Sequence, residues 1–333
     1  MEQKQTEKFK TMIGGQALIE GIMMRGPEKD AVVVRRSDGS LDVETTPRNL
    51  PPEGSPKKLP LIRGVVNFFD AQIVGVKALM RSAELAPEDA DDNNGQPSKF
   101  DLWLEKKLGE DGYQKVMVPL AVVFAMVMMI GLFFLLPMVI GGLFDGFVKS
   151  TFALNLIEGL VRILIFLVYM AAISGMKEMR RVFSYHGAEH KTIRCYEAGL
   201  PLTVENVRAQ TRLHPRCGTS FLLVVLVLSI LIFSVASTVL LALIPPLAAM
   251  RGTLLYRLIM ILFKLMLIPL TVSVSYEVNR WVGRHDNRLT RILTAPGMWF
   301  QHFTTREPDD GMMEVGIAAL EAVLPEKAGT DRW

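Results

Sequence analysis

The chain has 333 residues, of which 50% are apolar, and its mean hydropathy is +0.28. A soluble globular domain rarely has so apolar a composition, so we expect a lipid bilayer to surround much of the chain. The formal charge of +3 is small and no long basic run accompanies aromatic residues, which argues against a nucleic-acid partner.

The two cysteines, Cys195 and Cys217, are too few for a disulfide framework. Both fall in segments that we place in the cytosol, a reducing compartment, so we expect two free thiols. The N-terminal residues are polar, and the first long apolar run starts near residue 116. A cleaved secretory signal is therefore not expected.

Residues 1–60 are predicted to form a small cytosolic cap that contains β-strands. The run AVVVRR, the turn SDGS and the run LDVETT have the pattern of a hairpin. Upstream, residues 14–27 combine four glycines with Glu20 and Arg25, without the spacing of a dinucleotide-binding or P-loop fingerprint. These glycines either end strands or let the backbone approach a ligand.

Residues 61–86 carry apolar positions at helical spacing together with charged ones such as Arg63 and Asp70. This pattern suits an amphipathic helix that lies in the membrane interface. The alternative is a helix that packs on the soluble cap. Residues 87–115 follow as an acidic, turn-forming linker and a pre-membrane helix.

Four apolar segments are long enough to span a bilayer, which needs about 20 predominantly apolar residues. They occupy residues 116–144, 152–176, 219–244 and 253–276. Short connections join the first two and the last two, so we predict two transmembrane hairpins, at residues 116–176 and 219–276. The predicted fold is a mainly α-helical membrane protein with a small α+β N-terminal cap.

Residues 177–218, between the hairpins, are rich in arginine and lysine, whereas the two short turns carry only Lys149 and Arg251. Because basic loops are enriched on the cytoplasmic side, we expect this connection to face the cytosol from the cytoplasmic membrane. An even number of spans then places both termini in the cytosol. The C-terminal segment, residues 277–333, is expected to end in a helix from about residue 311 to 324.

The motif HGAEH, at residues 186–190, follows the second span. On a helix, its spacing places the imidazoles of His186 and His190 on one face, where they can share a metal ion. Glu189 would then be close enough to act as the catalytic base. Gly187 weakens the helix prediction. The alternative is a polar interfacial helix whose histidines hydrogen-bond to carboxylates or lipid phosphates.

A second pair, His214 and Cys217, directly precedes the third span and therefore reaches the same membrane face. Histidine and cysteine are zinc ligands, so we expect a shared site that holds zinc or another divalent metal. The alternative for Cys217 is an ordinary buried small residue, and for His214 a capping or core histidine.

Glu277, at the end of the fourth span, is a further candidate ligand or an acceptor that orients a histidine. A salt bridge to Arg280 is the competing interpretation. Nearer the C-terminus, Glu307, Asp309 and Asp310 suit a hard divalent ion, but a proline followed by aspartates ahead of a helix favours N-capping.

Lys264 lies near the centre of the fourth span, where an ammonium group costs roughly 3 kcal/mol on insertion scales. We expect it to face the bundle interior beside Arg257, with Glu158 of the second span as its counter-ion. Arg162 would join them in a polar patch between the second and fourth spans. The alternative is shorter spans, with a backbone carbonyl freed by Pro269 as the partner of Lys264.

Six segments of the chain together resemble the YqhQ-like family of bacterial membrane proteins. They are GGQALIEGIMMRGP, LPLIRGVVNFF, YHGAEHKTI, HPRCGTSF, YEVNRW and LTAPG. The motifs are specific, and the resemblance covers nearly the whole chain. The family has no known function and is described as predicted metal-dependent enzymes, so the resemblance implies a bacterial inner-membrane protein with a metal site.

The expected zinc site unites His186, His190 and His214, with or without Cys217. Three histidines would leave an open position for hydrolysis of an amide or ester at the membrane, with Glu189 as the base. Cys217 as a fourth ligand would close the site, and the protein would then be a scaffold or an assembly factor. A transporter that uses the intramembrane charges is a third hypothesis.

Overall fold

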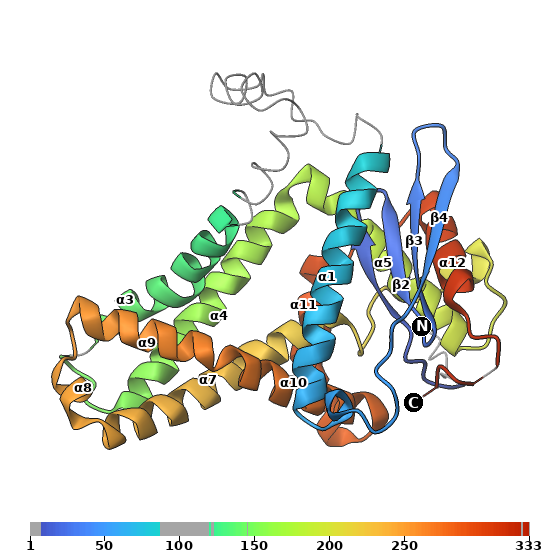
Figure 1. Ribbon diagram of the computed structural model, residues 1–333. Helices are drawn as coiled ribbons and strands as arrows, with labels where there is room; N and C mark the ends of the chain where they lie inside the picture. The colour runs from blue at the N-terminus through green and yellow to red at the C-terminus, as the bar shows by residue number, and fades with distance from the viewer. Residues whose placement is uncertain (1–7, 87–119, 121–122, 145, 328, 333) are drawn as a thin grey trace, which may run out of the picture. The chain divides into compact units, whose positions relative to one another are not determined.

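The computed structural model describes residues 8–86, 120, 123–144, 146–327 and 329–332. The chain forms two compact units (Figure 1). The first unit contains Met1–Ala90, Met170–Leu228 and Pro269–Trp333, and the second contains Asp91–Tyr169 and Ser229–Ile268. The predicted linker and pre-membrane helix, residues 87–115, lie outside the described residues.

The first unit contains a four-stranded antiparallel sheet in the order β1-β2-β3-β4. Its strands are β1 (Gly14–Leu18), β2 (Gly21–Arg25), β3 (Lys29–Arg35) and β4 (Leu41–Pro47). The predicted hairpin is confirmed as β3 and β4, where Val33 pairs with Val43. Gly39 adopts φ +82° in the turn between them, a conformation that glycine reaches without strain.

Helices cover both faces of this sheet, because its buried side chains alternate between the faces. On one face, Ile22 and Met24 join a core with Tyr185 of α5 (Lys177–Glu197) and Leu320 of α12 (Asp310–Val323). On the other face, a smaller cluster joins Leu18 and Met23 to Ala78 of α1 (Ile62–Leu85). The first unit therefore has three layers, in which the sheet of the predicted cap lies between helices on both faces (Figure 1).

Helix α1 has two different faces, which match the two interpretations of residues 61–86. Its buried positions are small residues that pack on neighbouring elements: Gly64, Gly75, Ala78 and Ser82. Its large apolar side chains are exposed, among them Phe69 at 56% and Ile73 at 58%. Placement of this exposed face in the membrane interface stays a prediction.

The final helix was predicted correctly, and α12 begins with the expected cap. Asp309 accepts a hydrogen bond from the backbone N–H of Met312 at 2.8 Å. By contrast, α11 (Arg288–Thr304) was not predicted. Asn287 and Thr290 form a capping box at its start, and Pro296 lies inside it. The first unit also contains η1 (Pro56–Lys58), α6 (Val204–Arg208) and most of α10 (Ile268–Arg284).

Among the residues that the structure describes, four helices are long and apolar enough to cross a membrane, as predicted. They are Val123–Gly142, Thr151–Gly175, Gly218–Leu243 and Leu254–Arg284. The first includes a π-helical turn η3 (Gly131–Leu135) and α3 (Leu136–Gly142), and the second and third are α4 and α7. The short α8 (Pro245–Ala249) precedes the fourth helix, which comprises α9 (Leu254–Met266) and α10. The fourth helix breaks at Leu267, two residues before a proline, which has no N–H to donate.

The second unit contains the predicted pairing of Lys264 with Glu158, which joins α9 to α4. Arg162 of the predicted patch also binds groups of η3: its Nε atom donates to the carbonyl of Phe133 at 2.7 Å, and its guanidinium lies 5.1 Å from the ring centroid of Phe134. Pro137, four residues after Phe133, has no N–H to donate to this carbonyl, which is therefore an available acceptor. The transport hypothesis built on these charges stays a prediction.

Candidate metal centre

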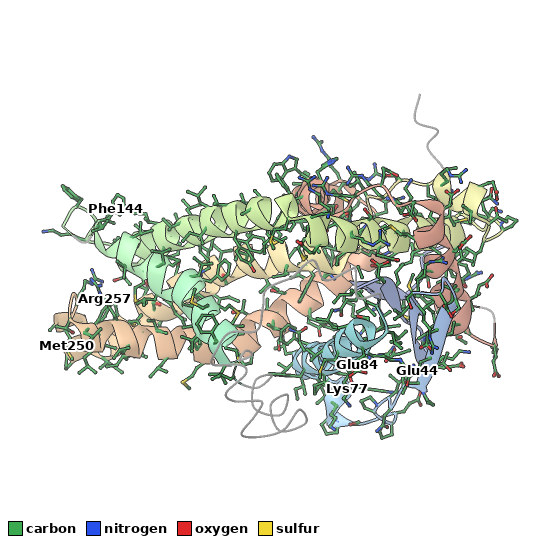
Figure 2. All side chains as sticks on the ribbon, turned by 90° about the horizontal axis from the view of Figure 1, so that it is seen from above. Glu44, Lys77, Glu84, Phe144, Met250 and Arg257 are labelled. Carbon is green, nitrogen blue, oxygen red and sulfur yellow. The ribbon has the colours of Figure 1, made fainter. Side chains whose placement is uncertain are left out.

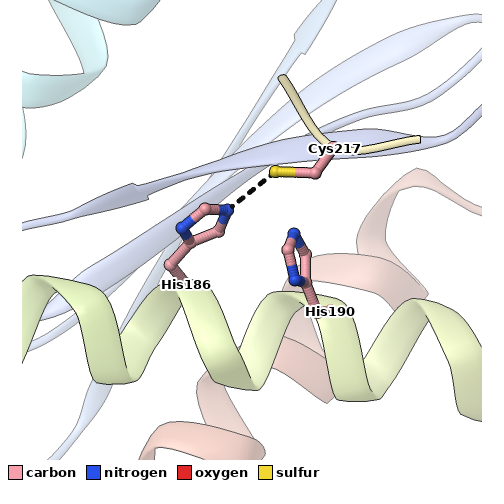
Figure 3. Close-up of side chains that lie close together, drawn as sticks. All are labelled: His186, His190 and Cys217. Atoms are coloured by element: carbon pink, nitrogen blue, oxygen red, sulfur yellow. Dashed lines mark hydrogen bonds between the residues drawn. The ribbon is translucent and has the colours of Figure 1, made fainter. Parts of the chain in front are cut away.

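The centre forms where α5 meets the loop that precedes α7, both in the first unit. The HGAEH motif is helical, so His186 and His190 lie one turn apart on one face of α5, with ring centroids separated by 4.4 Å. Cys217 faces them from the loop (Figure 3). One ligand atom from each of these three residues lies within 4.8 Å of the others.

Backbone carbonyls orient both imidazoles. The Nδ1 atom of His186 lies 2.8 Å from the carbonyl of Thr304, and that of His190 lies 2.6 Å from the carbonyl of Arg212. A carbonyl only accepts, so Nδ1 carries the proton in both rings and the neutral tautomer has its lone pair on Nε2. The Nε2 atom of His186 lies 3.2 Å from the Sγ atom of Cys217.

The Nε2 atom of His190 is an unsatisfied imidazole nitrogen of the centre. It is buried, and it has no hydrogen-bond partner among the residues that the structure describes. A buried polar atom without a partner costs about 1 to 3 kcal/mol. Imidazoles that bind a metal through one nitrogen commonly donate from the other to a carbonyl, as His186 and His190 do. The unsatisfied nitrogen therefore fits a metal ligand.

Cys217 is held in a form suited to metal binding. Its Sγ atom lies 3.3 Å from the N–H of Thr219 and 3.1 Å from the Oγ1 atom of the same residue. Burial alone raises the pKa of this thiol, but the neighbouring imidazoles of His190 and His186 lower that pKa well below its usual value. For His186 the two effects are reversed: burial lowers the pKa of its imidazole, but the nearby thiolate of Cys217 has the larger effect. The pKa of His186 is therefore raised to about 9.

Glu189 places a carboxylate at the edge of the cluster. Its Oε1 atom accepts from the N–H of Gly15 at 2.9 Å, which anchors it to β1. Its Oε2 atom lies 4.0 Å from the Nε2 atom of His186. Like the Nε2 atom of His190, this oxygen has no hydrogen-bond partner in the described part of the chain. Burial raises the pKa of this carboxyl, against the opposing effect of His186 and His190.

Two glycines let other segments approach the centre closely. A Cβ atom at Gly187 would clash with the carbonyl of Arg306, so glycine allows residues 304–308 to cross α5 and to bring the Thr304 carbonyl to His186. A Cβ atom at Gly15 would lie 3.1 Å from the Cδ atom of Glu189. The glycine-rich segment therefore approaches the candidate site, as one of the two interpretations expected.

His214 was predicted to be a ligand, and the structure places it beside the cluster with another partner. Its Nε2 atom lies 3.2 Å from the Oε2 atom of Glu197, and burial together with Arg216 lowers the pKa of its imidazole well below the usual value. Its ring centroid is 5.6 Å from that of His190. His214 is not part of the group of three residues whose ligand atoms converge.

Two buried residues that the sequence analysis missed fix the loop that carries Cys217. Gln301 of α11 accepts from the N–H of His214 at 2.8 Å and donates to its carbonyl at 2.7 Å and to Ser220 at 2.9 Å. Glu197 of α5 pairs with Arg216 and is fully buried. No local motif marks either residue, because both act on segments distant in the sequence.

Glu277 is not brought to the centre. Its carboxylate pairs with Arg63 of α1 at 2.7 Å and accepts from the N–H of Leu61 at 3.3 Å. The competing interpretation was also wrong about the partner, because no ion pair between Glu277 and Arg280 is found among the described residues. Arg63 could not be foreseen as the partner because it lies 214 residues earlier in the chain.

Several other predicted acidic and basic residues of the first unit are in ion pairs. Glu20 is buried, adopts φ 52° between β1 and β2, and pairs with Arg181 at 2.6 Å. Arg25 pairs with Asp30 at 3.1 Å and with Asp70 at 2.6 Å. Near the C-terminus, two acidic residues also pair: Glu307 with Lys191 at 2.6 Å, and Asp310 with Arg208.

The donor set fits zinc. Two imidazole nitrogens and a thiolate are ligands that zinc takes in proteins, and two such ligands in a tetrahedral site are about 3.5 Å apart. The separation of 3.2 Å between His186 and Cys217 is close to that distance. The described part of the chain therefore combines an α+β unit that carries a candidate metal centre with four helices long and apolar enough to cross a membrane.

The chain belongs to the family described as Protein of unknown function (DUF1385), whose pattern matches residues 59–326. It is 33% identical over 319 residues to the "Uncharacterized protein YqhQ" of Bacillus subtilis (strain 168), which covers 93% of this chain and 92% of the relative. The family resemblance expected from the motifs is confirmed. No solved structure matches the chain.

Proposed function

We propose that the protein is an integral protein of the cytoplasmic membrane that binds one zinc ion through His186, His190 and Cys217. The observation that carries this proposal is the buried Nε2 atom of His190, which lacks a partner among the described residues. It lies in a ring whose Nδ1 atom is already bound to a carbonyl. The proposed topology places the centre on the cytosolic side, because the connection that carries it is basic.

The proposed activity is metal-dependent hydrolysis of an amide or an ester at the membrane surface. Three protein ligands leave a fourth coordination position open, as in catalytic zinc sites, whereas four ligands make a structural site. A zinc ion held by His186, His190 and Cys217 would act as a Lewis acid and would lower the pKa of a water bound at the open position toward neutrality. Pairing of His214 with Glu197 supports the open arrangement, since it removes one candidate from the ligand set.

Glu189 is the proposed general base. Its Oε1 atom is held by Gly15, so the carboxylate keeps a fixed orientation while Oε2 stays free to take a proton from the attacking water. The raised pKa of this buried carboxyl suits a group that must accept that proton and then return it to the leaving group.

A structural metal site is the second candidate, and the burial of the centre favours it. His190 is 1% exposed and Cys217 is 5% exposed, so the described segments leave little access for a substrate. In this case Glu189 would complete the coordination as a fourth ligand, and the protein would be a scaffold or an assembly factor.

Cobalt substitution distinguishes the two candidates. We expect cobalt-loaded protein to change its visible absorption when acetohydroxamate is added, because an open position accepts the new ligand. Glu189→Gln should retain the metal, and so should His214→Gln. A spectrum that ignores acetohydroxamate, together with loss of metal in Glu189→Gln, would contradict the hydrolase proposal and identify Glu189 as a ligand.

A further inference from the structure

The second unit contains a cavity, whereas the candidate metal centre belongs to the first unit. The cavity is lined by residues of α3, α4 and α9 and of the turn that precedes α9. Thr151 starts α4 and Arg251 belongs to the turn between α7 and α9, so the cavity lies at the turn end of the hairpins. Figure 2 shows Arg257 at this end of the second unit, together with Phe144 and Met250.

The charges that line the cavity are mostly positive. Three are cationic, Arg251, Arg257 and Lys264, and one is anionic, Glu158. Three positive charges minus one negative charge leave a net charge of +2. Because Lys264 is paired with Glu158, the excess belongs to the two arginines.

The arginines are available to a ligand. Arg251 donates to the neutral hydroxyl of Thr151 at 2.6 Å, which leaves its charge uncompensated. The guanidinium of Arg257 has neither a hydrogen-bonded nor an ion-paired partner in the part of the chain that the structure describes. Two guanidinium groups at one cavity provide the planar, multiple donors that bind phosphate oxygens.

The size and walls of the cavity suit a phosphate group. Its volume is about 40 Å³ on a scale on which one water needs roughly 10 to 15 Å³, so about three waters or one phosphate group fit. Gly141, Gly142 and Gly252 line it without side chains that would block the ligand. Apolar side chains close in sequence to the lining residues are exposed, including Phe147 at 88% and Leu254 at 71%, so they are available to contact acyl chains.

We propose that this cavity binds the phosphate group of an anionic ligand between Arg251 and Arg257. The phosphate belongs either to a phospholipid headgroup or to a free phosphate compound, which share the chemistry that the arginines recognise. In the first case, the exposed apolar side chains of the adjoining turns contact the acyl chains. The inference does not depend on the metal centre, because every residue that lines the cavity belongs to the second unit.

The test uses the purified full-length protein in detergent and measures its melting temperature and its bound lipids. Four probes are added separately: a phosphatidylglycerol, a diacylglycerol with the same acyl chains, glycerol 3-phosphate and inorganic phosphate. Arg257→Gln removes the unpaired cation, and Arg251→Gln removes its neighbour. Lys149→Gln is the matched control, because Lys149 is exposed in the turn before α4 and does not line the cavity.

We expect phosphatidylglycerol to raise the melting temperature of the wild type and of Lys149→Gln. In either arginine variant, the apparent affinity for phosphatidylglycerol should be at least about tenfold weaker, because the variant lacks one charged hydrogen-bonded pair. Diacylglycerol should have no effect. Stabilisation by glycerol 3-phosphate or inorganic phosphate alone identifies a soluble phosphate ligand. Equal stabilisation by diacylglycerol, equal responses of all variants, or no response to any phosphate probe would overturn the proposal.

Discussion

The Nε2 atom of His186 and the Sγ atom of Cys217 lie 3.2 Å apart although 31 residues separate them in the sequence. Two packing features create this contact. Gly187 lets residues 304–308 cross α5, so that the Thr304 carbonyl orients His186. Gln301 binds the backbone of His214 and so fixes the loop that carries Cys217. The donor set therefore depends on the C-terminal segment as much as on the HGAEH motif.

Gly187→Ala should destabilise the protein, because the added Cβ atom meets the Arg306 carbonyl. We expect a loss of about 1 to 3 kcal/mol, the usual cost of overpacking, measured by thermal unfolding in detergent. Gly175→Ala is the control, since no atom lies within 4 Å of its Cβ position, and it should be neutral or slightly stabilising. Equal stability of both variants would show that the crossing is not as tight as described.

Gln301→Ala should weaken metal binding without removing a ligand. The substitution releases the loop between His214 and Ser220, and loss of such supporting contacts typically costs 10- to 100-fold in affinity. Competition with a chromogenic zinc chelator measures the change. His302→Ala, at the exposed neighbouring position, should keep the wild-type affinity. The account fails at this point if both variants bind zinc equally.

The two thiols should differ in their response to metal removal. Burial raises the pKa of Cys195 to about 11, so only about one molecule in a thousand carries its thiolate at pH 8. Iodoacetamide should therefore modify Cys195 slowly with or without chelator. Cys217 should be protected while metal is bound and react faster after chelation. Peptide mass spectrometry resolves the two sites, and a Cys217 rate that is independent of chelator would argue against ligation.

The topology prediction concerns the two hairpin turns and the basic connection. Single cysteines at Ser150 and Ala249, in a background without native thiols, should react with an impermeant maleimide in intact cells. A cysteine at Ser184 should react only after the membrane is permeabilised. Labelling of Ser184, and not of the two turn positions, in intact cells would reverse the proposed orientation.

The sequence allowed prediction of features that depend on local pattern. Apolar length identified the four long helices, and alternation identified the hairpin of β3 and β4. The pairing of Lys264 with Glu158 followed from the cost of an isolated charge among apolar residues. Asp309 was recognised as a helix cap from the proline and aspartates that precede α12.

Features that depend on tertiary packing were not predictable in the same way. Helix α11 was missed because Pro296 interrupts its pattern, although the capping box at Asn287 was a usable signal. The partner of His214, Glu197, lies on the opposite side of a loop, and nothing in its spacing distinguishes it from a surface carboxylate. Gly187 argued against a helix at the motif, whereas the structure requires glycine there because the Arg306 carbonyl packs against it.

The central claim is that His186, His190 and Cys217 hold one zinc ion. Metal analysis of protein purified without chelator, together with the absorption spectrum of its cobalt form, tests this claim most directly. We predict about one zinc per chain, strong loss of metal in His186→Ala and His190→Ala, and a thiolate-to-cobalt charge-transfer band that disappears in Cys217→Ser. Wild-type protein that contains no divalent metal, or histidine variants with unchanged occupancy, would contradict the account.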